Sequence, residues 1–566
     1  MSSDAPLTRR ALVALLVALL VAFALAWFAG LEYRTLLHPD EGRYAEIPRE
    51  MIVTGDWLTP HLNGLKYFEK PPLQYWITAA AYEVFGVHNW AARLWPALSS
   101  FLAALFLGYV GWRQGGPTLG LYTAAGLLGC VGYIINAHLL TLDGGLGAFL
   151  TLAFGAFLIA QRDDATQNEQ RNWMWVAWAA MAAATLSKGL IGVVIPGASL
   201  VLYTLVTRDF ALWRRLHLLS GSLLYLVLAA PWFIAVSRAN DGFFEFFFVH
   251  EHFQRYLTTT HKRDQAWWYF VPLFLVGMLP WLPLLGWGTL QIWRDGKPAA
   301  NGFSWQRFGV VWSVFIFVFF SASGSKLPSY ILPMFPALAL LAGWLLQRTE
   351  NRTLARLTLP MAGIMAALLV VLLVAYEPLV RRFVTEDVSL APALAFGPWF
   401  KSALAIGFFG GAVALWALRR PTSADRTTAV LALSLSVLIA TQIGLAGYDK
   451  FRSVRSSRDI LRAAETANGP FSPEVPFYHV HMFDQTVPFL LRRTTTFVEY
   501  RDEFALGIDA EPGKAIHTEA AWINTWKDLA QGYAMMPIDD FERLSKEGVP
   551  MKLLAGDSRR AIVSRR

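Results

Sequence analysis

Residues 37–72 read LHPDEGRYAEIPREMIVTGDWLTPHLNGLKYFEKPP, and this polar stretch determines how the chain is organised. It stands between an apolar run at residues 11–30 and a second one that begins near residue 92. A helix needs roughly 20 apolar residues to cross about 30 Å of hydrocarbon. The sequence therefore predicts a polar loop at a membrane surface, between two helices that cross the membrane.

Long apolar runs continue through most of the chain. Of its 566 residues 55% are hydrophobic and 16% are charged, whereas soluble proteins carry about 25% charged residues. The run at 11–30 exceeds the roughly 7–15-residue apolar core of a signal peptide, which indicates an uncleaved first helix. We expect about thirteen spanning helices. They are placed at residues 11–30, 92–112, 118–137, 145–161, 173–187, 190–206, 217–237, 268–288, 308–322, 330–346, 358–376, 400–418 and 428–446.

Arginine and lysine gather in the short loops on one side of these helices. By the positive-inside rule this side is cytoplasmic, as is the N-terminus. The net charge of +8 is then explained by topology, and we expect no nucleic-acid partner. The cations are Arg9 and Arg10, Arg113, Arg208 with Arg214 and Arg215, Arg294 with Lys297, Arg348 with Arg352 and Arg356, and Arg419 with Arg420. The longer segments 31–91 and 238–267 fall on the outer side.

The character of the chain changes near residue 449, where apolar runs shorten and charge rises. Residues 475–480 and 495–500 have strand patterns, and residues 455–467 and 519–531 have helical spacing. We expect a membrane domain at 1–448 and a soluble α/β domain at 449–566, on the outer side. The single cysteine, Cys130, excludes a disulfide within the chain and a cysteine metal cluster.

The polar loop also has helical spacing. Tyr44, Ile47 and Met51 repeat along residues 41–51, with charged residues on the other face. This pattern is typical of a helix lying in the membrane interface. It predicts that the charged side chains of the loop are held at the depth of lipid headgroups.

Two acidic positions stand out as candidate sites. The adjacent Asp40 and Glu41 have the chemistry of a general base, a hydroxyl- or amine-orienting group, or a cation ligand; the alternative is that Asp40 caps the following helix. Asp143 stands at the outer end of a predicted span, where an ionisable residue is a candidate functional group. Its alternative is likewise a helix cap.

Cations with aromatic neighbours lie on the same outer side. Arg43, Tyr67, Glu69 and Lys70 belong to the first outer loop, and the sequence KLPSY occupies residues 326–330. Cations of this kind suit a phosphate, or else they anchor helices at the interface. The segment 238–267 adds the sequence HEH at 250–252 followed by Arg255. Histidines beside a carboxylate such as Glu69 form a possible zinc site, or they bond to lipid headgroups.

These motifs resemble a known family. HPDEGRYAEIPREM at 38–51, GDW at 55–57 and LKYFEKPP at 65–72, with Asp143, HEH at 250–252 and KLPSY at 326–330, are similar to ArnT-type lipid A aminoarabinose transferases. That family belongs to the polyprenyl-phosphate-dependent glycosyltransferases, which include protein O-mannosyltransferases. The resemblance covers most of the membrane region.

The resemblance implies a reaction in the outer leaflet of a bacterial inner membrane. Aminoarabinose moves from undecaprenyl phosphate to a lipid A phosphate, with inversion, catalysed by a monomer that requires no cofactor. Asp40 is then the catalytic residue, supported by Asp143. Lys70, Arg255 and Tyr330 meet the donor phosphate, and Arg43, Tyr67 and Glu41 complete the substrate-binding surface. The resemblance also makes Glu69 and His250 ligands of a divalent metal such as zinc.

Two alternatives stay open at this point. One is a transferase of the same superfamily that moves another sugar to a protein or glycan, because one scaffold hosts several chemistries. A lipid transporter is the other; transporters, however, place ionisable residues near the middle of the membrane on broken helices and often contain repeats.

Overall fold

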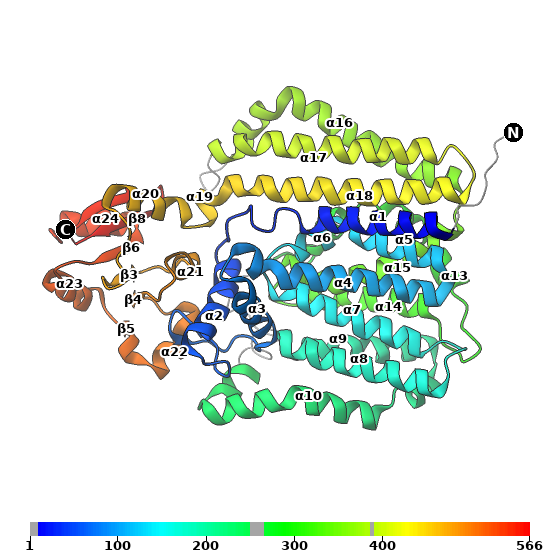
Figure 1. The fold of residues 1–566 in the computed structure, drawn as a ribbon, viewed down its shortest axis with the longest axis horizontal. Coiled ribbons are helices and arrows are strands. Elements are labelled where there is room, and N and C mark those ends of the chain that lie inside the picture. Colours follow the sequence, from blue (N-terminus) through cyan, green and yellow to red (C-terminus); the bar gives the residue numbers. More distant parts are fainter. Residues whose placement is uncertain (1–8, 249–264, 385–389, 566) are drawn as a thin grey trace.

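The computed structural model describes residues 9–248, 265–384 and 390–565. Figure 1 shows a bundle of long helices with a small α/β domain at one end. Helices α2 and α3 lie between the bundle and this domain, while α16 and α10 lie at opposite edges of the bundle. The predicted fold class, a polytopic helical membrane protein with a C-terminal α/β domain, is confirmed.

The bundle is built from elements of very different length and burial. Its elements are α1 (Arg9–Phe28), α4 (Asn89–Gly115), α5 (Pro117–Leu128), α6 (Val131–Ala137), α7 (Leu142–Ala160), α8 (Gln167–Lys188), α9 (Ile191–Thr207), η1 (Phe210–Arg215), α10 (Leu218–Ala239), α12 (Phe270–Gly277), α13 (Leu282–Asp295), α14 (Trp305–Ala322), η3 (Pro328–Met334), α15 (Phe335–Arg348), α16 (Asn351–Phe383), α17 (Leu390–Ala417) and α18 (Ser423–Gly447). Within the described residues, 8 helices are long and apolar enough to cross a membrane, or up to 10 if each bent pair counts as one.

Two predicted spans are broken. The span expected at 118–137 is α5 followed by α6, bent by 63°, and the one at 268–288 is α12 followed by α13, bent by 101°. Pro280 lies in the second break, and a proline removes a backbone donor and ends a helix. Helices α1 and α9 are shorter apolar helices. The number of spans stays a prediction.

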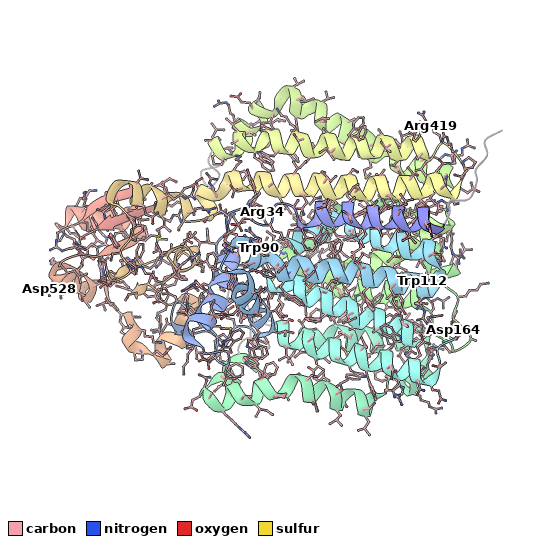
Figure 2. The ribbon with its side chains drawn as sticks, viewed as in Figure 1. Arg34, Trp90, Trp112, Asp164, Arg419 and Asp528 are labelled. Carbon is pink, nitrogen blue, oxygen red and sulfur yellow. The ribbon has the colours of Figure 1, made fainter. Side chains whose placement is uncertain are left out.

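The cation-bearing loops meet at the end of the bundle remote from the α/β domain. The side chain of Gln347 donates to the carbonyl of Gly115 (3.2 Å), and Arg426 donates to the carbonyl of Gln347 (2.8 Å). Arg113 forms an ion pair with Glu169 at 2.5 Å. Figure 2 labels Trp112, Asp164 and Arg419 at this end, and Arg34 and Trp90 near the α/β domain.

The C-terminal domain is built on a mixed sheet with strand order β5-β4-β3-β6-β8-β7. Strands β3, β4, β5 and β6 pair in parallel, and β8 pairs antiparallel with β6 and β7. The predicted strands and helices at 475–480, 495–500, 455–467 and 519–531 are confirmed as β3, β4, α20 and α23. The elements are η4 (Tyr448–Phe451), α19 (Arg452–Arg455), α20 (Arg458–Asn468), β3 (Phe477–Val480), α21 (Thr486–Leu491), β4 (Thr496–Val498), η5 (Asp502–Phe504), α22 (Ala505–Ala510), η6 (Pro512–Lys514), β5 (Ala515–Ile516), α23 (Glu519–Asp528), β6 (Tyr533–Pro537), α24 (Ile538–Lys546), β7 (Lys552–Gly556) and β8 (Arg560–Ser564).

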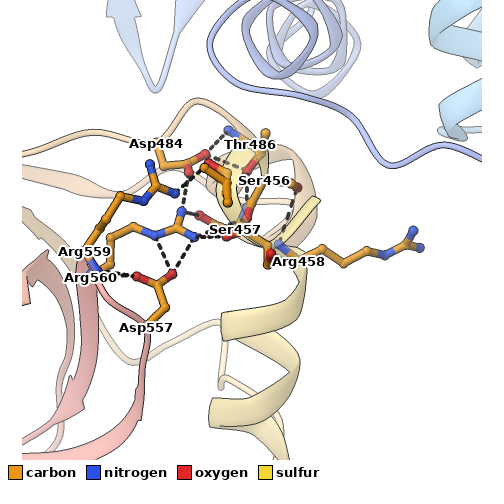
Figure 3. A network of polar contacts seen from close by, with 10 residues as sticks. Ser456, Ser457, Arg458, Asp484, Thr486, Asp557, Arg559 and Arg560 are labelled. Atoms are coloured by element: carbon orange, nitrogen blue, oxygen red, sulfur yellow. Dashed lines mark hydrogen bonds and ion pairs between the residues drawn. The ribbon is translucent and has the colours of Figure 1, made fainter. Parts of the chain in front are cut away.

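A buried arginine ties this domain to the chain that leaves α18. Arg560 donates to Asp484 (2.7 Å) and to the hydroxyl of Ser457 (2.8 Å), and it also pairs with Asp557 at 2.8 Å. Figure 3 shows these contacts converging where α20 begins. Because Arg560 and Asp484 are almost fully buried, losing either would leave an uncompensated charge inside the junction.

The first outer loop forms α2 (Asp40–Thr54), the hairpin β1 (His61–Leu62) and β2 (Leu65–Lys66), and α3 (Leu73–Phe85). The expected helix is present, but residues 41–51 are all buried, so its charged face is not turned toward lipid headgroups. The C-terminal domain covers it. A Cβ added to Gly42 would lie 2.6 Å from the backbone of Gln485, and Arg49 donates to the carbonyl of Arg492 at 3.2 Å.

Candidate active site

A cavity of about 540 Å³ opens where α2, α7, α9, α14 and η3 meet. One part of its wall is charged and the rest is mostly apolar. The charged residues are Asp40, Arg43, Glu69, Lys70, Asp143 and Lys188; the others are Tyr44, Asn136, Leu139, Thr141, Leu142, Leu146, Leu190, Ile191, Val194, Ile195, Phe319, Phe320, Ser323, Ser325, Leu327, Pro328, Ser329, Tyr330 and Pro333. The wall thus combines three acids and three cations with many apolar side chains.

Helix α9 supplies one side of the apolar part. Ile191, Val194 and Ile195 repeat at the spacing of one helix face, and all three line the cavity. Phe319 and Phe320, at the end of α14, lie in the same wall. A cavity lined by both apolar and charged side chains is suited to an amphiphilic ligand with a lipid tail and a charged head.

Asp143 lies in the first turn of α7, and both of its oxygens have partners. Lys188 forms an ion pair with Oδ1, and the hydroxyl of Ser329 donates to Oδ2 at 2.8 Å. Lys188 Nζ also lies 4.8 Å from the ring centroid of Tyr330. The residue before α7 is Thr141, without a side-chain capping bond. Asp143 therefore pairs with Lys188, and the residue at the cap position of α7 is Thr141.

Asp40 begins α2 and lines the cavity with a side chain that is 37% exposed. Its Oδ1 lies 3.1 Å from Nη1 of Arg43. The guanidinium of Arg43 lies 5.8 Å from the ring centroids of both Tyr44 and Tyr67. On its other edge it pairs with Glu503 of the C-terminal domain. The helix has no side-chain cap, so the alternative of Asp40 as a capping residue is not supported.

Glu41 points away from the cavity, although the sequence suggested a substrate-binding role. Its carboxylate accepts two hydrogen bonds from Arg93, both at 2.8 Å, and one from the backbone of Leu140 at 3.0 Å. Burial by itself raises the pKa of Glu41, but Arg93 and Arg34 outweigh it and lower the pKa to about 2. Glu41 is therefore part of a buried ion pair that fixes α2 to α4, and its expected place in substrate binding is corrected.

The remaining predicted residues fall into three groups. Glu69, Lys70 and Tyr330 line the same cavity as Asp40. Tyr67 lies behind it, almost fully buried, with its hydroxyl donating to Glu503 at 3.3 Å. His250 and Arg255 lie outside the described residues, so a metal site at Glu69 and His250 and a phosphate contact by Arg255 stay predictions.

A different group of possible metal ligands lies in the C-terminal domain. The ligand atoms of His481, Glu519 and Asp540 are within 4.8 Å of one another. Arg543 pairs with Glu519 at 2.5 Å and with Asp540 at 2.9 Å. Arg543 thus supplies the positive partner of both carboxylates.

Three residues at or near the site, Lys188, Ser329 and Glu503, are hard to recognise from the sequence. Lys188 follows a predicted span as a single cation. Ser329 lies inside the recognised KLPSY sequence, but nothing local indicates that its hydroxyl reaches Asp143. Glu503 is more than 400 residues from Arg43, and no pattern in either segment points to the other.

Comparisons with known proteins agree with this geometry. A family model described as dolichyl-phosphate-mannose-protein mannosyltransferase matches residues 12–294, and one described as aminoarabinose transferase C-terminal domain matches residues 463–565. The undecaprenyl phosphate-alpha-4-amino-4-deoxy-L-arabinose arabinosyl transferase of Edwardsiella ictaluri is 31% identical over 75% of this chain and 76% of that protein. Its counterpart in Erwinia tasmaniensis is 32% identical over 68% and 70%.

Solved structures give the same result. The crystal structure of ArnT from Cupriavidus metallidurans bound to undecaprenyl phosphate covers 98% of both chains, with a TM-score of 0.90 and 35% identity. Its apo structure gives a TM-score of 0.89. Fold and cavity thus define an integral-membrane, polyprenyl-phosphate-dependent glycosyltransferase. Within that class, the chain belongs to the family of undecaprenyl phosphate-aminoarabinose arabinosyl transferases, the ArnT family.

Proposed function

We propose that this enzyme transfers 4-amino-4-deoxy-L-arabinose from undecaprenyl phosphate to a phosphate group of lipid A, with inversion at the anomeric carbon. The observation that carries the proposal is the cavity whose lining combines Asp40, Lys70 and Lys188 with apolar side chains of α7, α9 and α14. A polyprenyl tail suits the apolar side chains, and a phosphate suits the lysines.

The proposed transfer step follows from the charged residues that line the cavity. The bond between the anomeric carbon and the donor phosphate oxygen breaks as an acceptor phosphate oxygen forms the new bond from the opposite face. Negative charge grows on the departing lipid phosphate, and Lys70, Lys188 and Tyr330 are placed to stabilise it. The acceptor oxygen is already ionised, so it needs little help from a base. Asp40 then orients the sugar, with its carboxylate facing the sugar's ammonium group.

The other assignments follow from this function. We place the membrane domain at residues 1–448 and the C-terminal domain at 449–566. The protein lies in the bacterial inner membrane as a monomer, with the cavity and the C-terminal domain in the periplasm and the cation-rich loops in the cytoplasm, as the positive-inside rule favours. The proposed step uses the charges of the cavity and requires no cofactor; a zinc ion at Glu69 and His250 stays a prediction.

The experiment is expression in a host that lacks its own aminoarabinose transferase but makes the donor. Mass spectrometry of lipid A should show one added aminoarabinose per modified phosphate, together with resistance to polymyxin. Unmodified lipid A would contradict the proposal.

One observation favours a second candidate, transfer of a sugar to a protein. The mannosyltransferase family model matches half of the chain. If this reading were correct, the same host would show glycosylated periplasmic protein and unchanged lipid A. The aminoarabinose transferase match of the C-terminal domain supports the first candidate.

A further inference from the structure

Arg43 connects the cavity to the C-terminal domain. One edge of its guanidinium faces Asp40 in the cavity, with Nη1 3.1 Å from Oδ1. The other edge pairs through Nη2 with Glu503. Arg43 is thus held between two carboxylates that come from opposite ends of the sequence.

Glu503 is itself held rigidly. Its side chain is 9% exposed. Oε1 accepts a hydrogen bond from the side chain of Gln485 (2.7 Å), and Oε2 accepts one from Tyr67 (3.3 Å). The next residue, Phe504, is fully buried and its ring contacts that of Tyr67 at 6.2 Å between centroids. A carboxylate fixed by two donors and a neighbouring aromatic anchor has few alternative positions.

The C-terminal domain and the first outer loop pack closely at two glycines near Glu503. A Cβ on Gly507 would lie 2.7 Å from the carbonyl oxygen of Lys66, and one on Gly42 would lie 2.6 Å from the backbone of Gln485. Both distances are shorter than real Cβ contacts, so only glycine permits this approach. The position of Glu503 over Arg43 is therefore fixed by backbone packing on both sides of it.

Arg43 has other acids within electrostatic reach. Glu69 acts on it electrostatically and lines the same cavity as Asp40 and Asp143. Without Glu503, the guanidinium would lose the partner that sets its direction and would turn away from Asp40 toward Glu69. Asp40 would then lose the contact that orients its carboxylate, and a displacement of about 1 Å at a reacting centre can cost about 100-fold in rate.

We propose that Glu503 is a positioning residue for the transfer reaction: the C-terminal domain, through Glu503, holds Arg43 so that Asp40 keeps its orientation in the cavity. This inference rests on the transferase function proposed above. It assigns the C-terminal domain a direct part in building the active site, in addition to its own fold.

The test uses the purified full-length enzyme with undecaprenyl phosphate-linked aminoarabinose and lipid A. In the variant Glu503→Gln, kcat should fall by about 10- to 100-fold, while KM for the donor should stay within about twofold, because the residues proposed to meet the donor phosphate are unchanged. Glu503→Asp keeps the charge and should recover part of the lost kcat.

Glu511 offers a matched control. It also bridges the C-terminal domain to the first outer loop, accepting from the backbone of Lys66 at 3.2 Å and pairing with Lys514 at 2.8 Å. Neither of these contacts involves Arg43. Glu511→Gln should keep kcat within about twofold, since it breaks a domain contact without touching Arg43.

The outcomes separate the two proposals. A Glu503→Gln enzyme that keeps its kcat, or a Glu511→Gln enzyme that loses as much, would overturn the positioning role. If Glu503→Gln does not accumulate, Glu503→Asp decides, and an unchanged kcat there also overturns it. A wild-type enzyme that transfers no sugar in the same assay would refute the proposed function instead.

Discussion

Lys188 reaches across from the end of α8 to form an ion pair with Asp143 at the start of α7. The pair lines the cavity, and Ser329 donates to the second oxygen of the same carboxylate. Each carboxylate oxygen of Asp143 thus has one partner, the ammonium of Lys188 or the hydroxyl of Ser329. We infer that it serves to fix the direction of Lys188.

Asp143→Asn should therefore weaken donor binding as well as turnover. The amide removes the charge that holds Lys188, so the ammonium is free to move away from the phosphate. We expect kcat/KM for the undecaprenyl-linked donor to fall by about 10- to 100-fold. Ser329→Ala leaves the ion pair in place and should cost less. Equal losses in the two variants would show that the ion pair is not the important contact.

Glu41 and Arg93 form the second pair to test, here for stability. Breaking a buried ion pair by removing one partner costs about 3–5 kcal/mol. We expect Glu41→Gln to lower the free energy of unfolding by that order, measured by thermal unfolding in detergent. Glu169→Gln is the control: it breaks the Arg113 pair, whose side chains are 26% exposed, and should cost at most about 1 kcal/mol. Similar losses in both variants would contradict the structural role of Glu41.

The same residue predicts a pH dependence. The pKa of Glu41 in the folded protein is about 2, below its ordinary value of 4.5. Its contribution to stability is therefore present above pH 4.5 and is lost as the pH falls from 4.5 toward 2. Wild type should lose more stability than Glu41→Gln over this interval, as followed by unfolding midpoints. Parallel curves would contradict the assignment.

Glu50 on α2 predicts the opposite slope. It accepts from the backbones of Asn63 (2.5 Å) and Gly64 (2.9 Å). Burial raises its pKa to about 8, and neighbouring Glu46 adds to the effect. A raised pKa favours the folded state below pH 4.5, and this contribution is lost as the pH rises through 8. Glu50→Gln cannot titrate, so its stability should vary less between pH 5 and 9, and a variant with the wild-type slope would contradict this.

Domain docking is tested at Gly42. A side chain there would meet the backbone of Gln485 and Thr486, so Gly42→Ala should push the C-terminal domain away from α2 and increase proteolysis at the junction. Gly363→Ala is the control, because a Cβ at that position in α16 meets nothing within 4 Å. Equal protease resistance of the Gly42→Ala variant and the wild type would show that the interface is looser than described.

Much of this arrangement could be predicted from local sequence. Apolar run length locates the bundle helices, and the motif-bearing loops indicate that Asp40, Lys70 and Tyr330 meet. The ion pair of Glu41 could not be predicted, because its partner Arg93 stands at the edge of a predicted span. An arginine at that position is typical of an interface anchor. The burial of α2 could not be predicted either, because its amphipathic pattern fits a lipid surface as well as a protein surface. Which of the two surfaces α2 packs against depends on the folded C-terminal domain.

The central claim is that Asp40 orients the aminoarabinose for transfer from the polyprenyl phosphate. The most direct measurement is lipid A mass spectrometry in a host without its own transferase, comparing wild type with Asp40→Asn at equal protein levels. We predict aminoarabinose-modified lipid A with the wild type and none, or at most about 1% of that amount, with the variant. Full modification by Asp40→Asn would contradict the role of Asp40, and with it the account of the cavity given above.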